Sequence, residues 1–180
     1  MKKICSGKIE FRIIILCLVL IFSVTEIISK PNIQQNDEVA KRPKTKVTLK
    51  LDKGKVNVEF PSVAYVMEDG SISIIPGETF FIEFDIVNET LVRPKYSKNN
   101  RDSSKTLKLS MLQSKDGTIL IIDNGFSKPI IADCFVQYYG TNKLIKSNIL
   151  PVLPRMGSAE GWDNRVCFIL LRNIRFQEYY

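Results

Sequence analysis

The sequence predicts an all-β fold, an antiparallel β-sandwich built from residues 47–180. Three observations support this prediction. Short segments of alternating apolar and polar residues recur along the chain, glycine-centred turns separate them, and no segment has the 3.6-residue period of an amphipathic helix. About eight or nine strands are expected, which also suits a partly closed barrel, because strand spacing alone does not distinguish the two architectures.

The clearest strand pair lies in Ser71–Asn88, where a turn at Pro76-Gly77 joins two strands. Alternate residues of a strand point to opposite faces of a sheet. The second strand therefore has a wholly apolar face, whereas its other face carries two carboxylates. The apolar face comprises Phe80, Ile82, Phe84 and Ile86, and the other Phe81, Glu83, Asp85 and Val87. A slip of one residue would bury both carboxylates, so the register of this strand is strongly specified.

The remaining strands are predicted from the same alternation and from turn residues. They are residues 47–51, 56–60, 63–67, 107–111, 118–122, 130–139 and 165–171, the last with an extension to 176. Two polar or proline- and glycine-rich stretches, 90–104 and 148–161, are predicted to be irregular loops.

Pro76-Gly77-Glu78-Thr79, which leads directly into an apolar strand, resembles the turn and strand of many exported immunoglobulin-like domains. This resemblance implies a sandwich of the immunoglobulin-like type. It implies nothing about function, because one fold serves many functions.

The N-terminus has the layout of an export signal. A cationic start is followed by the apolar run Ile13–Phe22 and then by Ser23-Val24-Thr25. A cleaved signal peptide within residues 1–29 is favoured over an uncleaved anchor at 11–28, because charged residues leave fewer than the roughly 20 apolar residues of a comfortable membrane span. Residues 30–46 are then a flexible linker, and the body is extracytoplasmic: periplasmic, secreted or on the surface.

Composition restricts the chemistry. The chain of 180 residues has no histidine, which excludes histidine general bases, serine–histidine nucleophiles and the commonest zinc ligand. Asp116, Asp123 and Asp133 lack the spacing of a calcium loop. We therefore expect neither an enzyme nor a metal or cofactor, and no nucleic-acid motif accompanies the net charge of +7.

The positive charge is concentrated in two runs, Lys41–Lys55 and Arg93–Lys108. A solvated linker and a solvated loop are the simpler interpretation. If the second run is instead a binding site, its residues are Arg93, Lys95, Lys98 and Arg101, with Trp162 as an aromatic contact. The partner would be another envelope or surface protein or an anionic surface component.

Two cysteines, Cys134 and Cys167, lie in predicted strands of the body. In an oxidising compartment such a pair favours a disulfide over two buried free thiols.

The leading functional hypothesis is a non-catalytic binding module in the cell envelope or at the cell surface. The second is a structural subunit that assembles by pairing sheet edges. The third is a glycoside hydrolase that uses Glu83 and Asp85, about 7 Å apart on one strand face. Asn88-Glu89-Thr90 is in addition a formal glycosylation sequon.

Overall fold

The computed structural model describes residues 39–51, 53–100, 102–114 and 116–178. The predicted export segment, residues 1–29, and the linker up to residue 38 lie outside the described residues. None of the described residues forms a helix with the length and apolarity that crossing a membrane requires.

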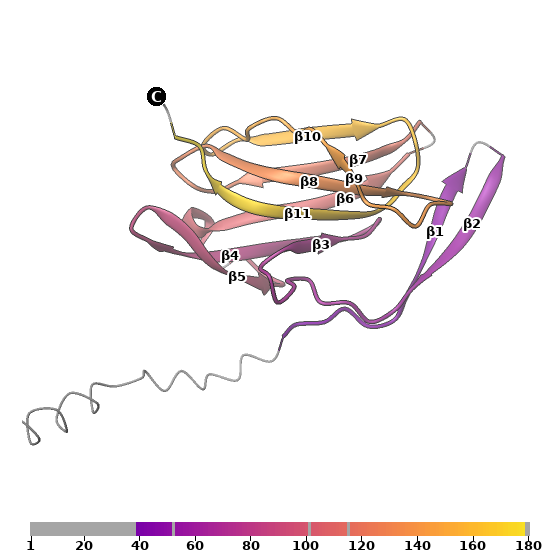
Figure 1. Cartoon of the computed structure of the whole chain (residues 1–180), viewed down its shortest axis with the longest axis horizontal. Coiled ribbons are helices and arrows are strands. Elements are labelled where there is room, and N and C mark those ends of the chain that lie inside the picture. Colours follow the sequence, from indigo (N-terminus) through magenta and orange to yellow (C-terminus); the bar gives the residue numbers. More distant parts are fainter. Residues whose placement is uncertain (1–38, 52, 101, 115, 179–180) are drawn as a thin grey trace, which may run out of the picture. The chain divides into compact units, whose positions relative to one another are not determined.

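The described chain is all-β and its strand pairs are antiparallel, which confirms the predicted class. One sheet has five strands in the order β10-β7-β6-β4-β5, and the other has four in the order β3-β11-β8-β9 (Figure 1). The first contains β4 (Thr79–Val87), β5 (Thr90–Ser97), β6 (Thr106–Gln113), β7 (Thr118–Asn124) and β10 (Gly157–Trp162). The second contains β3 (Ile72–Ile74), β8 (Ile130–Tyr138), β9 (Ile145–Ser147) and β11 (Val166–Phe176). A 3₁₀ turn, η1 (Ser103–Lys105), precedes β6.

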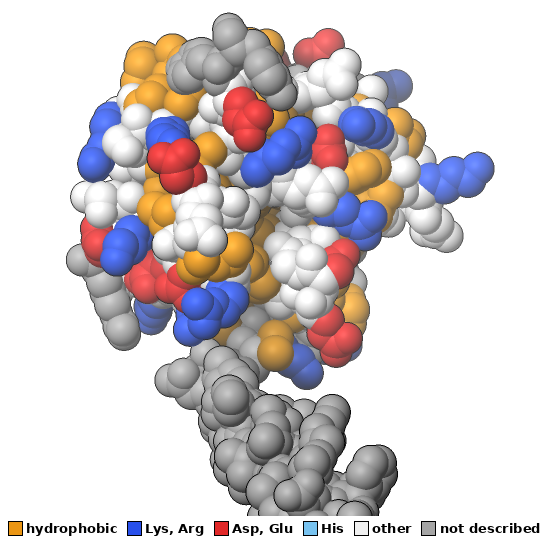
Figure 2. Space-filling view, turned by 60° about the vertical axis from the view of Figure 1, so that its left-hand side comes forward, with side chains coloured by type: hydrophobic (Ala, Val, Ile, Leu, Met, Phe, Trp, Pro, Cys, Tyr) orange, Lys and Arg blue, Asp and Glu red, His pale blue; other side chains and the backbone are white. Residues whose placement is uncertain are grey.

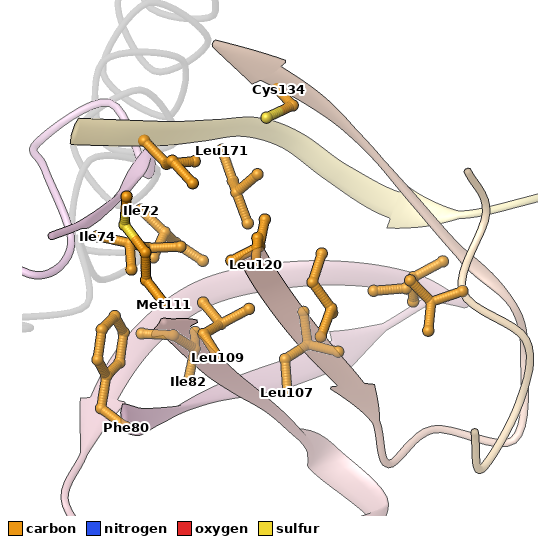
Figure 3. Close-up of a cluster of buried hydrophobic side chains, with 14 of the residues drawn as sticks. Ile72, Ile74, Phe80, Ile82, Leu107, Leu109, Met111, Leu120, Cys134 and Leu171 are labelled. Atoms are coloured by element: carbon orange, nitrogen blue, oxygen red, sulfur yellow. The ribbon is translucent and has the colours of Figure 1, made fainter. Parts of the chain in front are cut away.

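The two sheets share one hydrophobic core, to which each contributes the alternate residues of its strands (Figure 3). Strand β4 buries Phe80, Ile82 and Phe84, as its sequence pattern predicts. The opposite sheet contributes Ile72 and Ile74 from β3, among others. Two antiparallel sheets that cover each other in this way are compatible with a β-sandwich.

Ile86 differs from the prediction, because its side chain is 44% exposed rather than part of the core. The pairing of β4 with β5 shifts in register between Glu83 and Asp85. Such a shift interrupts the regular alternation of faces. The alternation therefore identifies the inward face only up to Phe84.

A separate hairpin precedes the two sheets and consists of β1 (Thr45–Leu51) and β2 (Gly54–Phe60). Its residues Leu49 and Phe60 form a second, smaller hydrophobic cluster with Ile75, which follows β3, and Cys167 of β11. The Arg165 guanidinium donates a hydrogen bond to the carbonyl of Lys50, so the hairpin is tied to the start of β11.

The structure replaces parts of both predicted loops with strands. Within 90–104 lies β5, an edge strand that tolerates Pro94 and its polar residues because only one of its sides is paired. Within 148–161 lies β10, whose Gly-Ser-Ala-Glu-Gly sequence has low β propensity. Conversely, the strand predicted at 63–67 is reduced to isolated bridges of Ala64 and Val66.

Candidate functional site

The basic residues predicted as a binding site are distributed along β5 and the segment that follows it. Arg93 pairs with Asp85 on β4 across 3.1 Å, and Lys95 lies opposite Glu83 in the strand register. Lys98 is exposed beyond the end of β5, and Arg101 lies outside the described residues. Both carboxylates proposed for a hydrolase thus lie beside cations of the neighbouring strand.

The molecular surface mixes both signs of charge. On the face drawn in Figure 2, Lys and Arg side chains lie among Asp and Glu side chains, and no broad area on this face is of one sign. Interspersed charges of this kind are typical of a solvated surface.

Trp162 lies far from the basic residues in the sheet order, because β10 and β5 are opposite edges of the five-stranded sheet. Its indole Nε1 donates a hydrogen bond to Ser147 Oγ at 2.9 Å, and its ring packs against the main core. The structure therefore does not bring Trp162 together with Arg93 and Lys95.

The predicted disulfide is not formed, since both cysteines in the described chain are free buried thiols. Cys134 lies opposite Leu171 in the β8–β11 register, four residues along β11 from Cys167. Four strand residues correspond to about 13 Å, well beyond the separation that a disulfide bridges. The two thiols also belong to different hydrophobic clusters. Burial raises the pKa of Cys134 to about 12, and burial also raises the pKa of Cys167.

Two of the three aspartates considered for calcium binding, Asp123 and Asp133, interact with other side chains. Asp123 pairs with Lys108 at 3.2 Å, and Asp133 accepts a hydrogen bond from Asn173 Nδ2 at 2.7 Å. Over the described part of the chain, no three acidic or cysteine side chains come together as a candidate metal site.

A buried polar cluster around Arg42 was not foreseen from the sequence. Arg42 lies in the predicted linker, yet its side chain is only 1% exposed. Its guanidinium bonds Glu78 at 2.7 and 3.0 Å and Ser73 at 2.8 Å, and it lies 4.5 Å from the ring centre of Tyr65. Burial, followed by the charge of Glu78, raises the pKa of Tyr65 to about 12. The position of Arg42 within a run of polar residues offers no signal of burial.

The segment between β8 and β10 is rich in exposed apolar side chains. Among the described residues ten large hydrophobic side chains are exposed, and five of them come from residues 144–156, that is, from the residue before β9, from β9 itself and from the loop that leads to β10. These five, which we call the apolar loop surface, are Leu144, Ile145, Leu150, Leu153 and Met156. Leu150 is the most open of them, at 72% exposure.

The connection between β9 and β10 joins an edge strand of one sheet to an edge strand of the other. The backbone N–H of Leu150 donates to Glu160 Oε1 on β10 at 2.9 Å, and Val152 forms a bridge with Ile130 on β8. The loop is thus held at several points while its apolar side chains face solvent. The sequence signal was present in the run Ile149-Leu150-Pro151-Val152-Leu153, but the prolines led to its interpretation as an irregular loop only.

Comparisons with known proteins add no relative: no protein-family model, curated protein or solved structure matches this chain.

Proposed function

We propose that this protein is a non-catalytic binding module, an immunoglobulin-like β-sandwich that is exported and either released or held at the membrane by its N-terminal segment. The export part of this proposal rests on the cationic start and the apolar run Ile13–Phe22. The binding part rests on the apolar loop surface, because exposed clusters of apolar side chains are characteristic of sites that contact another macromolecule.

The charge around this surface indicates the kind of partner. Residues 139–158 contain Lys143, Lys146 and Arg155 and no acidic residue, but Lys146 pairs with Asp133 at 3.5 Å and Glu160 on β10 accepts a hydrogen bond from the N–H of Leu150. The surface therefore carries a small excess of positive charge. A partner that presents apolar side chains flanked by carboxylates would match both properties. We therefore propose an envelope or surface protein with an acidic and apolar contact region.

The hydrolase alternative has less support. Asp85 is paired with Arg93, and Glu83 lies opposite Lys95, which is the pattern of cross-strand pairs on a sheet surface. The structural-subunit alternative has a specific observation in its favour, because β10 is an edge strand of the five-stranded sheet.

A capture experiment with the full chain tests the proposed surface. Leu150 and Leu153 are changed together to Asp, and Ile86 and Val87, which are also exposed but lie at the β4–β5 hairpin, are changed together to Asp as the matched control. We expect saturable binding of one partner that the first variant loses and the control retains. Equal binding by all three proteins, or equal loss in both variants, would refute this surface as the binding site.

A further inference from the structure

The edge strands of the two sheets differ in how they are protected against pairing with another chain. Natural proteins shorten such edges or give them charges, prolines and bulges. Strand β5 carries Pro94 and a positive φ of 49° at Arg93, and its pairing with β4 is irregular. Strands β3 and β9 have only three residues each.

Strand β10 has no proline, no bulge and no positive φ, and its one charged residue is Glu160. It has six residues, Gly157–Trp162, and pairs with β7 in an unbroken register. The N–H of Asn124 donates to the carbonyl of Met156, which makes this pair a hydrogen-bonded one. Because hydrogen-bonded pairs alternate in an antiparallel ladder, the backbone groups of Gly157, Ala159 and Gly161 point away from β7. All three of these residues are exposed.

We propose that a second copy of this chain pairs with β10 across a two-fold axis at Ala159, which joins the two five-stranded sheets into one. An axis at Ala159 places Gly157 of each copy opposite Gly161 of the other, so every outward backbone group of the strand acquires a partner. The small side chains of these residues leave the approaching backbone unobstructed.

The side chains in this register are complementary as well. Ser158 lies opposite Glu160. Arg155, in the turn before β10, and Asp163, in the bend after it, come at the two ends of the strand pair, where the arginine of one copy is next to the aspartate of the other. Arg155 and Asp163 are both exposed, and neither has an ion pair within the described chain, so two intermolecular pairs of opposite charge become available. A shift that moves the axis to Glu160 would instead place this carboxylate opposite its copy, which disfavours that register.

This self-pairing rests on the edge of β10 alone, but it shares Arg155 and Met156 with the surroundings of the apolar loop surface, so the two kinds of binding are tested separately. Its isologous geometry limits assembly to a dimer, because each copy uses the same edge once. We therefore expect a concentration-dependent dimer rather than a filament.

Site-specific crosslinking of the full chain in mild detergent tests the register. Ala159→Cys is made in a background in which Cys5 and Cys17 are replaced by Ser, and Thr90→Cys on the protected β5 edge is the control. In a hydrogen-bonded antiparallel pair the Cα atoms lie about 5.5 Å apart, a distance that suits a disulfide. We expect an oxidised dimer from Ala159→Cys and none from Thr90→Cys; equal crosslinking of both, or of neither, would overturn the proposal.

Charge exchange tests the same register independently, by sedimentation of the full chain over a range of concentrations. Arg155→Asp replaces two favourable pairs by two repulsive ones, and we expect a dimer dissociation constant about tenfold higher. The double variant Arg155→Asp/Asp163→Arg should restore it to within about threefold of the original. Failure of the double variant to restore dimerisation, or a monomeric parent protein, would contradict the proposed register. The variant Ala159→Pro separates dimerisation from partner binding, because it lacks the outward N–H of position 159. We expect this variant to be a monomer that still binds the partner.

Discussion

The contacts of Arg42 predict a large loss of stability when its charge is removed. Arg42→Met keeps most of the apolar stem and deletes the guanidinium, which leaves the largely buried carboxylate of Glu78 without its cation. It also leaves the carbonyl of Ser73 without the donor that lies 2.8 Å away. Breaking a buried pair on one side costs about 3–5 kcal/mol. Because Glu78 retains 16% exposure and a hydrogen bond from the N–H of Ile75, we expect about 3 kcal/mol.

Urea unfolding of the full chain measures this loss. With a slope of about 2 kcal/mol per M, a loss of 3 kcal/mol lowers the unfolding midpoint by about 1.5 M. The matched control is Lys44→Met, since Lys44 pairs with Glu59 at 3.0 Å but both side chains are exposed. An exposed pair contributes at most about 1 kcal/mol.

A double variant identifies the cause of the loss. In Arg42→Met/Glu78→Gln no charge is left unpaired, so this variant should be more stable than Arg42→Met alone by about 1 kcal/mol or more. A midpoint for Arg42→Met no lower than that of Lys44→Met would refute the assignment of Arg42 as a buried anchor of the segment before β1.

Three further results are expected. Gly125→Ala should destabilise the protein by about 1–3 kcal/mol, because a Cβ there would lie 1.8 Å from the carbonyl oxygen of Ser103; Gly161→Ala, which meets no atom within 4 Å in one copy, should change the midpoint little at protein concentrations below those of dimerisation. Cys134 and Cys167 should react with iodoacetamide only after unfolding at neutral pH, since burial raises the pKa of both thiols; rapid reaction of the folded protein would contradict their burial. The pKa of Tyr65 rises from 10.0 to about 12 on folding, so the folded state holds the phenol proton more tightly than the unfolded state. The resulting contribution to the free energy of unfolding is lost as pH rises through that interval. Tyr65→Phe should abolish this loss, and an unchanged alkaline transition would show that another group causes it.

Sequence patterns predicted the central strands well and the edges poorly. In β4 and β7 alternate residues are buried, and in β6 the residues that belong to the core, Leu107, Leu109 and Met111, also alternate, so the period of two is visible in the sequence. An edge strand has fewer neighbours, and its residues can be polar or small without loss of the fold. The sequences of β5 and β10 therefore look like loops. Both proposed surfaces nevertheless involve edge strands: the apolar loop surface includes β9, and the proposed dimer contact uses β10.

The separation of the two cysteines and the burial of Arg42 could not be predicted from sequence patterns for a different reason. Both depend on register and distant contacts rather than on local alternation. Cys134 and Cys167 are separated by four positions of β11, which becomes visible only when β8 and β11 are paired. Arg42 is bonded to a residue 36 positions away, and nothing in the polar run around it indicates that contact.

The apolar loop surface as a partner-binding site is the central claim, and photo-crosslinking in the cells that make the protein tests it most directly. A benzophenone side chain is introduced into the full chain at Leu150, or at Val87 as the exposed control. We predict that light links position 150 to one extracytoplasmic protein, with an adduct that Leu153→Asp diminishes, and that position 87 yields no such adduct. Absence of an adduct from position 150, or the same adducts from both positions, would contradict the claim.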